Sequence, residues 1–295
     1  MNYFFLLTGI IIIVLVVKYR VQQKSDRWKT PNEPFPLDWK VLLREEVSFY
    51  NALEPESKSH FEFKMQEFLL NCRITGIKTD VSIKDQILIA ASAIIPIFSF
   101  KDWRYINLNE VLLYPRMFND SFDLDGKGRN IMGMVGSGYM NGLMILSKEA
   151  LYLGFKNETD KKNTAVHEFV HLIDKIDGVV DGVPEILLQK QYVIPWLDLM
   201  KIKMEEIYTQ SSDINPYGGT NQAEFFAVIS EYFFERPKLL QRNHPELYRM
   251  LEQMFQQNMS SKKLNRSSTS IGRNSTCPCA SGDKFKRCCG KPHYT

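Results

Sequence analysis

The chain has 295 residues, of which 44% are hydrophobic and 12% aromatic, so it can bury one sizeable core with small additional segments. Its formal net charge at pH 7 is only +3, which is too small to indicate direct binding to nucleic acid. Four of its five cysteines fall between Cys277 and Cys289, a clustering typical of metal ligation in a reducing compartment and not of a disulfide framework.

The first 17 residues carry no charged side chain, and we predict a membrane anchor over residues 1–20. At 1.5 Å per residue this run is roughly 25 Å long, which is within the range of spanning helices. Basic residues follow the run, beginning with Lys18 and Arg20, so the positive-inside rule places the main body in the cytoplasm. A cleaved signal peptide would instead carry its positive charge before the apolar run. Residues 21–36, charged and then proline-bearing, are interpreted as a tether.

Further elements follow in chain order. Helical periodicity dominates residues 39–70 with a break at Pro55, and a helix capped by Ser82 and Asp85 is predicted to stop at Pro96. The candidate strands are residues 111–114 and 143–146, residues 119–142 are predicted to be loop, and residues 195–208 are predicted to be helical. The second strand either pairs with an extended substrate or is an ordinary buried strand, and the sequence leaves both open.

The pattern H-E-x-x-H occurs at His167, Glu168 and His171. Two histidines four apart on a helix share one face, roughly 5–6 Å apart at Cβ, so both imidazoles can reach one zinc ion. Glu168 projects about 100° round the helix, where its carboxylate can take a proton from a water activated by that ion. Thr164 is predicted as the N-cap, and Gly178 is predicted to end the helix. The alternative is a pair of histidines that merely pack in a core or face water.

A later apolar helix carries two candidates for a third ligand, Glu224 and Glu231. They are seven residues apart, roughly 10 Å along a helix axis, so one ion can take only one of them. Glu224 also matches a capping box with Asn221, in which it would serve only the helix end. The residues alone leave this choice open. Asp174, one turn beyond His171, either orients a histidine or lies on a solvated face.

Residues 259–275 form a polar linker, after which four cysteines lie close together. These are Cys277, Cys279, Cys288 and Cys289. A segment this short has almost no core, so binding a tetrahedral zinc ion would supply its folding energy, while redox-active cysteines are the alternative. The basic residues among them either face an acidic protein partner or are simply solvated. They are Lys284, Lys286, Arg287 and Lys291.

The assembled motifs resemble the Mlc titration factor A family of zinc-dependent peptidases over about residues 37–258. Several separated motifs carry the resemblance, in the right order. They are His167-Glu-Phe-Val-His171-Leu-Ile-Asp, Asn221-Gln-Ala-Glu-Phe-Phe-Ala, Tyr114-Pro115 and Pro245-Glu-Leu-Tyr248. The resemblance implies an α+β, mainly helical, zincin-like fold similar to the catalytic domain of anthrax lethal factor, with a small sheet beside the zinc helix.

The same resemblance implies the site. One catalytic zinc ion would have His167, His171 and Glu224 as its ligands. Glu168 would be the catalytic base, Tyr217 would face the reaction centre, and Glu231 would have a structural role. The substrate would be a peptide or protein, with endopeptidase and aminopeptidase activity both open.

The cysteine tail, residues 276–292, is similar to the SEC-C motif, which implies a second, structural zinc ion and docking to a protein partner. The sequence as a whole therefore predicts a membrane-anchored, cytoplasmic zinc metallopeptidase. Because the best-known member of the resembled family also binds a transcriptional repressor, the alternative is a non-catalytic scaffold that sequesters a regulatory protein at the membrane.

Overall fold

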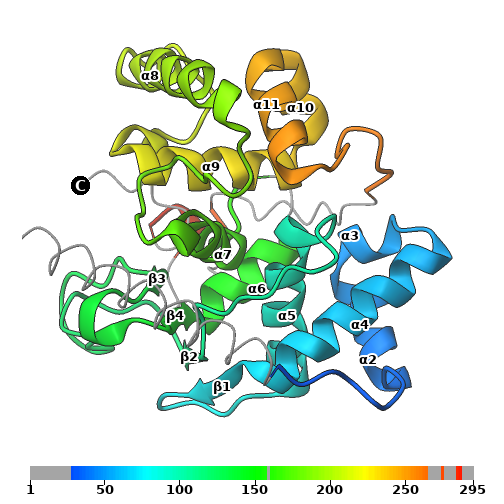
Figure 1. Cartoon of the computed structure of the whole chain (residues 1–295). Helices are drawn as coiled ribbons and strands as arrows, with labels where there is room; N and C mark the ends of the chain where they lie inside the picture. Colours follow the sequence, from blue (N-terminus) through cyan, green and yellow to red (C-terminus); the bar gives the residue numbers. More distant parts are fainter. Residues whose placement is uncertain (1–27, 158–159, 265–273, 276–283, 288–295) are drawn as a thin grey trace, which may run out of the picture.

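The computed structural model describes residues 28–157, 160–264, 274–275 and 284–287 (Figure 1). Its helices are α2 (Leu37–Glu46), α3 (Ser48–Asn51), α4 (Pro55–Asn71), α5 (Ile83–Ile97), α6 (Lys148–Lys156), α7 (Thr164–Asp174), α8 (Val193–Tyr208), α9 (Gln222–Glu235), α10 (Pro237–Asn243) and α11 (Pro245–Phe255). Its strands are β1 (Arg73–Gly76), β2 (Glu110–Tyr114), β3 (Gly133–Val135) and β4 (Leu143–Ser147). The described chain is thus α+β and mainly helical, as predicted.

The predicted membrane anchor, residues 1–20, lies outside the described residues. Within the described ranges, no helix combines the length and the apolar character that crossing a lipid bilayer requires. Residues 28–36 run without helix or strand along α4 (Pro55–Asn71), where the backbone of Lys29 exchanges two hydrogen bonds with the Asn71 side chain.

The N-terminal helices follow the predicted capping signals. Pro55 occupies the first turn of α4, where its missing N–H costs no hydrogen bond. Ser82 and Asp85 form a complete capping box at the start of α5. This helix ends at Ile97, one residue beyond the predicted end at Pro96, a difference within the usual spread of helix ends.

The sheet has the order β1-β2-β4-β3, with β1, β2 and β4 parallel and β3 antiparallel to β4 at one edge. β2 and β4 correspond to the two predicted strands. The prediction of loop for all of residues 119–142 is wrong, because β3 lies within them. A strand of three residues that begins with a glycine has little strand propensity of its own, and its pairing with β4 holds it in the sheet.

The two faces of the sheet contribute to different cores, as the period of two along a strand requires. Val111, Leu113 and Met144 face the main core, which the helices complete. Tyr114 and Ile145 face a smaller cluster on the other side, covered by the segment that follows β2. Both faces of the central strands are therefore buried.

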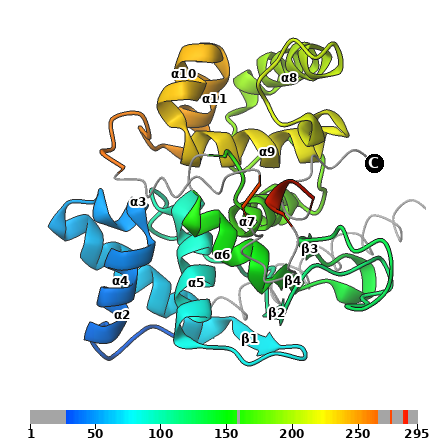
Figure 2. The ribbon, with the colours of Figure 1, turned by 180° about the vertical axis from the view of Figure 1, so that it is seen from behind.

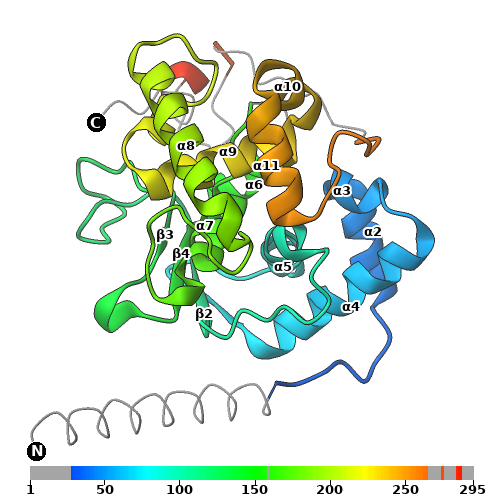
Figure 3. The same cartoon turned by 45° about the horizontal axis from the view of Figure 1, so that its top comes forward.

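Helix α7 lies at the centre of the molecule, in contact with α5, α6, α9 and β3 (Figure 1). α8, α10 and α11 cover α9 on the side away from the sheet (Figures 2 and 3). This arrangement presses two helices that are distant in sequence, α7 and α9, directly against each other.

Candidate metal centre

Helix α7 begins at a side-chain cap. Asn163 is the N-cap, and its Oδ1 accepts a hydrogen bond from Val166 N at 3.1 Å. The prediction of Thr164 as N-cap is therefore wrong by one residue; both residue types carry the short side-chain oxygen that a cap needs. Gly178, with φ of 105°, ends the helical segment, as predicted.

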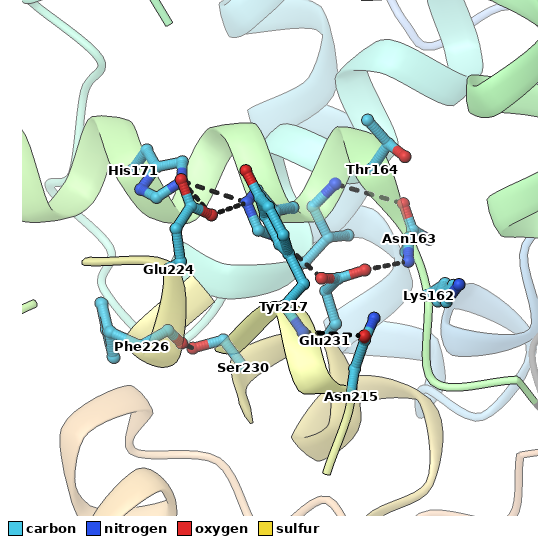
Figure 4. Close-up of polar contacts among 12 residues, drawn as sticks. Lys162, Asn163, Thr164, His171, Asn215, Tyr217, Glu224, Phe226, Ser230 and Glu231 are labelled. Atoms are coloured by element: carbon cyan, nitrogen blue, oxygen red, sulfur yellow. Dashed lines mark hydrogen bonds and ion pairs between the residues drawn. The ribbon is translucent and has the colours of Figure 1, made fainter. Parts of the chain in front are cut away.

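Two imidazoles of α7 and one carboxylate of α9 converge on a single point (Figure 4). His171 Nε2 lies 3.1 Å from His167 Nε2. Glu224 Oε2 lies 2.9 Å from His167 Nε2 and 3.5 Å from His171 Nε2. The three residues thus offer one potential ligand atom each, all within 4.8 Å of one another.

These separations fit a zinc ion. Tetrahedral zinc holds nitrogen and oxygen ligands at roughly 2.0–2.2 Å, which places neighbouring ligand atoms about 3.3 Å apart. The observed nitrogen–nitrogen and nitrogen–oxygen distances are 3.1, 2.9 and 3.5 Å. Two imidazoles with one carboxylate are also the donor set of known catalytic zinc sites that keep a fourth position open.

The Glu224 side chain reaches the candidate metal centre, although its backbone N–H takes part in the N-cap of α9. Asn221 Oδ1 accepts a hydrogen bond from Glu224 N at 2.9 Å, which is the backbone half of the predicted capping box. The Glu224 carboxylate instead faces the two histidines. The cap fixes the first turn of α9 and so aims Glu224 at α7.

Glu231, two turns further along α9, holds His167 from the other side. Its Oε1 lies 2.8 Å from His167 Nδ1, and its Oε2 accepts a hydrogen bond from Asn163 N at 2.5 Å. A carboxylate on Nδ1 fixes the ring so that Nε2 points into the site, and it raises the basicity of that nitrogen. This geometry agrees with the structural role that the resemblance implied for Glu231.

Asp174 is fully buried, so the interpretation of this residue as part of a solvated face is wrong. Its Oδ2 accepts a hydrogen bond from Gly182 N at 2.8 Å. Its Oδ1 and the Nδ1 of His171 are both buried without a hydrogen-bond partner among the described residues. Unlike Glu231 with His167, Asp174 therefore forms no hydrogen bond with His171, and the prediction that it orients a histidine stays a prediction.

Glu168 and Tyr217 line two cavities that meet at the metal centre. The smaller cavity has a volume of about 220 Å³ and the larger about 730 Å³, and His167 lines both as well. Glu168 is only 5% exposed, whereas Tyr217, on a turn before α9, is 37% exposed. The Tyr217 ring centroid lies 6.1 Å from that of His167. Glu168, Tyr217 and the three potential ligand residues therefore surround one space.

Burial raises the pKa of Glu168 above its usual range. Burial would raise the pKa of Glu224 as well, but hydrogen bonds to the two histidines outweigh it and lower that pKa. In His167 burial lowers the pKa, and the carboxylates of Glu231 and Glu224 outweigh it, so the net shift is strongly upward. Burial, with nearby carboxylates, raises the pKa of Tyr217, so its hydroxyl stays protonated and can donate a hydrogen bond.

Strand β3 is the part of the site that sequence reasoning missed. Gly133 lies so close to α7 that a Cβ there would stand 2.7 Å from Glu168 Oε1. Lys175 ties the segment after β3 to the end of α7, because its Nζ donates to Gly136 O at 2.6 Å and to Asn141 Oδ1 at 2.9 Å. The only signal in the sequence was the glycine content of the stretch, which also predicts a loop.

The predicted option that residues 143–146 pair with a substrate is wrong. These residues form β4, which lies between β2 and β3 and has both edges occupied. The edge strand beside α7 is β3, and it lines both cavities.

The sequence profile of the glucose-regulated metallopeptidase M90 family matches residues 20–256. The chain belongs to this family. M90 members are metallopeptidases, which agrees with the cluster of His167, His171 and Glu224.

Relatives of this M90 chain include an uncharacterized protein of Synechocystis sp., 29% identical over 236 residues, which are 75% of this chain and 84% of the relative. A protein named Mlc titration factor A from Pectobacterium atrosepticum is 27% identical over 175 residues, 55% of this chain and 64% of the relative. Its namesake from Escherichia fergusonii is 27% identical over 255 residues, 78% of this chain and 91% of the relative. The predicted family resemblance is thereby confirmed.

The profile of the SEC-C motif matches residues 273–291, which confirms the predicted motif. The four cysteines that carry it lie outside the described residues. They are Cys277, Cys279, Cys288 and Cys289. A structural zinc ion on these thiolates therefore stays a prediction.

Proposed function

We propose that this M90 family member hydrolyses peptide bonds with a zinc ion held by His167, His171 and Glu224. The observation that carries the proposal is the convergence of these three side chains from two helices, in a space also lined by Glu168 and Tyr217. A zinc ion bound there supplies a Lewis acid and lowers the pKa of a coordinated water toward ~7.

In the proposed reaction, side chains of the protein transfer the proton of the attacking water, stabilise the developing oxyanion and orient a zinc ligand. Glu168 accepts a proton from the attacking water and later passes it to the leaving amine. The Tyr217 hydroxyl donates a hydrogen bond to the oxyanion that develops on the scissile carbonyl. Glu231 keeps His167 in the tautomer that turns Nε2 toward the ion.

Among the described residues, no strand pairs with the outer edge of β3, and this edge offers a place for the substrate backbone. Met132 O accepts a hydrogen bond from Ser147 N of β4 at 2.7 Å. Because alternate residues of an antiparallel strand bond to the same neighbour, Gly133 and Val135 direct their N–H and C=O groups away from the sheet. An extended peptide adds to such an edge as a further strand, and antiparallel addition gives the more stable pairing.

A catalytic test compares peptide hydrolysis by the zinc-loaded wild type and by Glu168→Gln. We expect the variant to bind the same amount of zinc and to lose about 10²- to 10⁴-fold in kcat, because glutamine cannot accept the proton. Glu224→Gln serves as the contrasting variant, since glutamine still caps a helix but is a poor zinc ligand, so its zinc content should fall. Equal rates for the wild type and Glu168→Gln would overturn the assignment.

We also propose that residues 1–20 anchor the protein in a membrane with its main body in the cytoplasm, and that residues 37–258 form the peptidase domain. The support is the charge-free run of 17 residues and the basic residues that follow it, beginning with Lys18. The full chain should remain with membranes after an alkaline wash, while a chain that starts at Trp28 should be released. Equal release of both would contradict the anchor.

The name of two relatives supports a second candidate, a non-catalytic scaffold that sequesters a regulatory protein. The scaffold function predicts a different result for Glu168→Gln. If a partner protein is captured equally by the wild type and Glu168→Gln, and neither form cleaves any peptide, the scaffold function replaces the enzyme.

A further inference from the structure

The direction of β3 determines which cavity receives which side of a substrate. The smaller cavity lies at the start of the strand, where Asn130 and Met132 line it, and the larger one extends past its end, to Ser137. A peptide that runs antiparallel to β3 therefore places the residues before the scissile bond in the larger cavity. The residue that follows the scissile bond enters the smaller one.

The lining of the smaller cavity combines Ile131, Met132 and Gly133 of the β3 segment with several polar side chains. Asn130, Lys162 and Asn215 contribute to it, together with the residues of the metal centre. Lys162 precedes the N-cap of α7 and is only partly exposed. Among the residues that the structure describes, its ammonium group has no hydrogen bond and no ion pair. Its neighbour Lys161 differs, because it forms an ion pair with Asp213 at 2.9 Å.

Among the described residues, no acidic group pairs directly with the Lys162 ammonium, although Glu235 Oε2 accepts a hydrogen bond from the Lys162 backbone N at 2.9 Å. Glu231 uses one oxygen for His167 Nδ1 and the other for a backbone N–H. Asp160 accepts hydrogen bonds from Asn157 Nδ2 at 2.8 Å and from the backbone N of Lys162 at 3.1 Å. Glu168 also lines the cavity, but the proposed mechanism uses its carboxylate on the attacking water. The positive charge of Lys162 is therefore not neutralised by a direct partner.

We propose that the smaller cavity selects substrates with an acidic side chain, aspartate or glutamate, directly after the scissile bond, and that Lys162 is the residue that determines this preference. This inference rests on the proposed peptidase function. A carboxylate in the cavity would pair with the Lys162 ammonium, and the amides of Asn130 and Asn215 can donate further hydrogen bonds to it. For a partly exposed pair, we expect a preference of about fivefold in kcat/KM over the uncharged amide.

The test uses the zinc-loaded full chain and a set of peptides that differ only at the residue after one scissile bond, with Asp, Glu, Asn, Gln, Lys or Leu at that position. Mass spectrometry of the products identifies the bond that is cut. The wild type should cut before Glu and Asp about fivefold faster than before Gln and Asn, and the preference should shrink at high salt. Lys162→Met should abolish the preference, and Lys162→Glu should reverse it in favour of Lys.

A matched control is Lys201→Glu, which makes the same change of charge on the exposed surface of α8 and should keep the wild-type preference. The rate on the Leu peptide reports whether each variant is folded and active. Hydrolysis without an acidic preference, or a preference unchanged in Lys162→Met, overturns this inference and leaves the peptidase function standing. An acidic preference before the scissile bond overturns the assignment of the two cavities. Absence of all hydrolysis by the wild type overturns the proposed function itself.

Discussion

At the scale of single residues, two glutamates of α9 contact different nitrogens of the same histidine at the candidate metal centre. Glu224 faces His167 Nε2 and Glu231 faces His167 Nδ1, so the same imidazole lies between a candidate ligand and the group that orients it. Only the nitrogen that points into the site can bind an ion. The other nitrogen needs a hydrogen-bond acceptor, which Glu231 provides.

Glu231→Gln tests this arrangement. We expect zinc affinity to fall about 10- to 100-fold, because an amide oxygen is a weaker acceptor for the Nδ1 proton than a carboxylate. Competition with a coloured chelator measures the affinity without any need for activity. Glu246→Gln, at an exposed position of α11, is the control and should bind zinc like the wild type. Unchanged affinity in Glu231→Gln would show that His167 does not depend on this carboxylate.

At the scale of elements, the approach of β3 to α7 leaves no room for a side chain. A Cβ on Gly133 would stand 2.7 Å from Glu168 Oε1 and 2.9 Å from Thr164 Cγ2. The backbone of Gly133 does not require a positive φ, so the constraint is purely steric. The glycine therefore lets the edge strand approach Glu168, the proposed catalytic base.

Gly133→Ala should displace the Glu168 carboxylate and lower kcat about 10- to 100-fold, because small displacements of a catalytic group are costly. Zinc content should remain that of the wild type, since no ligand atom contacts the new methyl group. Steady-state kinetics and metal analysis on the same preparation measure both quantities. A normal kcat would mean that β3 shifts without consequence for Glu168.

A second element-scale feature holds the loop that carries Tyr217. Asp213 in this loop accepts hydrogen bonds from Tyr232 Oη at 2.6 Å and pairs with His244 Nε2 at 2.7 Å and Lys161 Nζ at 2.9 Å. Burial would raise the pKa of Asp213, but hydrogen bonds from Tyr232, Lys161 and His244 outweigh it and hold the pKa well below its usual range. One carboxylate thus connects four segments of the chain.

Asp213→Asn should lower the free energy of unfolding at pH 7 by about 1 kcal/mol, a modest value because the Asp213 side chain is 35% exposed. A depressed folded-state pKa stabilises the fold fully above the unfolded-state value, near pH ~3.9, and this contribution declines progressively as the pH falls from there toward the folded-state pKa. The difference in Tm between variant and wild type should therefore shrink in acid. Thermal unfolding from pH 7 down to pH 3 measures this, and a constant difference would contradict the linkage.

At the scale of the whole molecule, the two predicted zinc sites draw on different residues of the chain. The first draws on α7 and α9, and the second on thiolates of the SEC-C motif at residues 273–291. The full chain should contain two zinc ions per molecule, Cys279→Ser should retain about one, and Glu224→Gln should also retain about one. Metal analysis after gel filtration distinguishes these results. If the wild type contains a single zinc ion and only Cys279→Ser loses it, the prediction of a catalytic zinc site is wrong.

The sequence by itself determined the features that depend on neighbours in the chain. The spacing of His167 and His171 and the cap formed by Ser82 and Asp85 follow from the 3.6-residue turn, which needs no tertiary contact. Only the tertiary structure decided that Glu224 faces the imidazoles while Glu231 lies behind one of them. The sequence pattern of the helix is compatible with either glutamate as the one that faces the histidines. The tertiary structure also decided that β3, and not β4, forms the free edge, because a three-residue strand exists only through pairing with a distant segment.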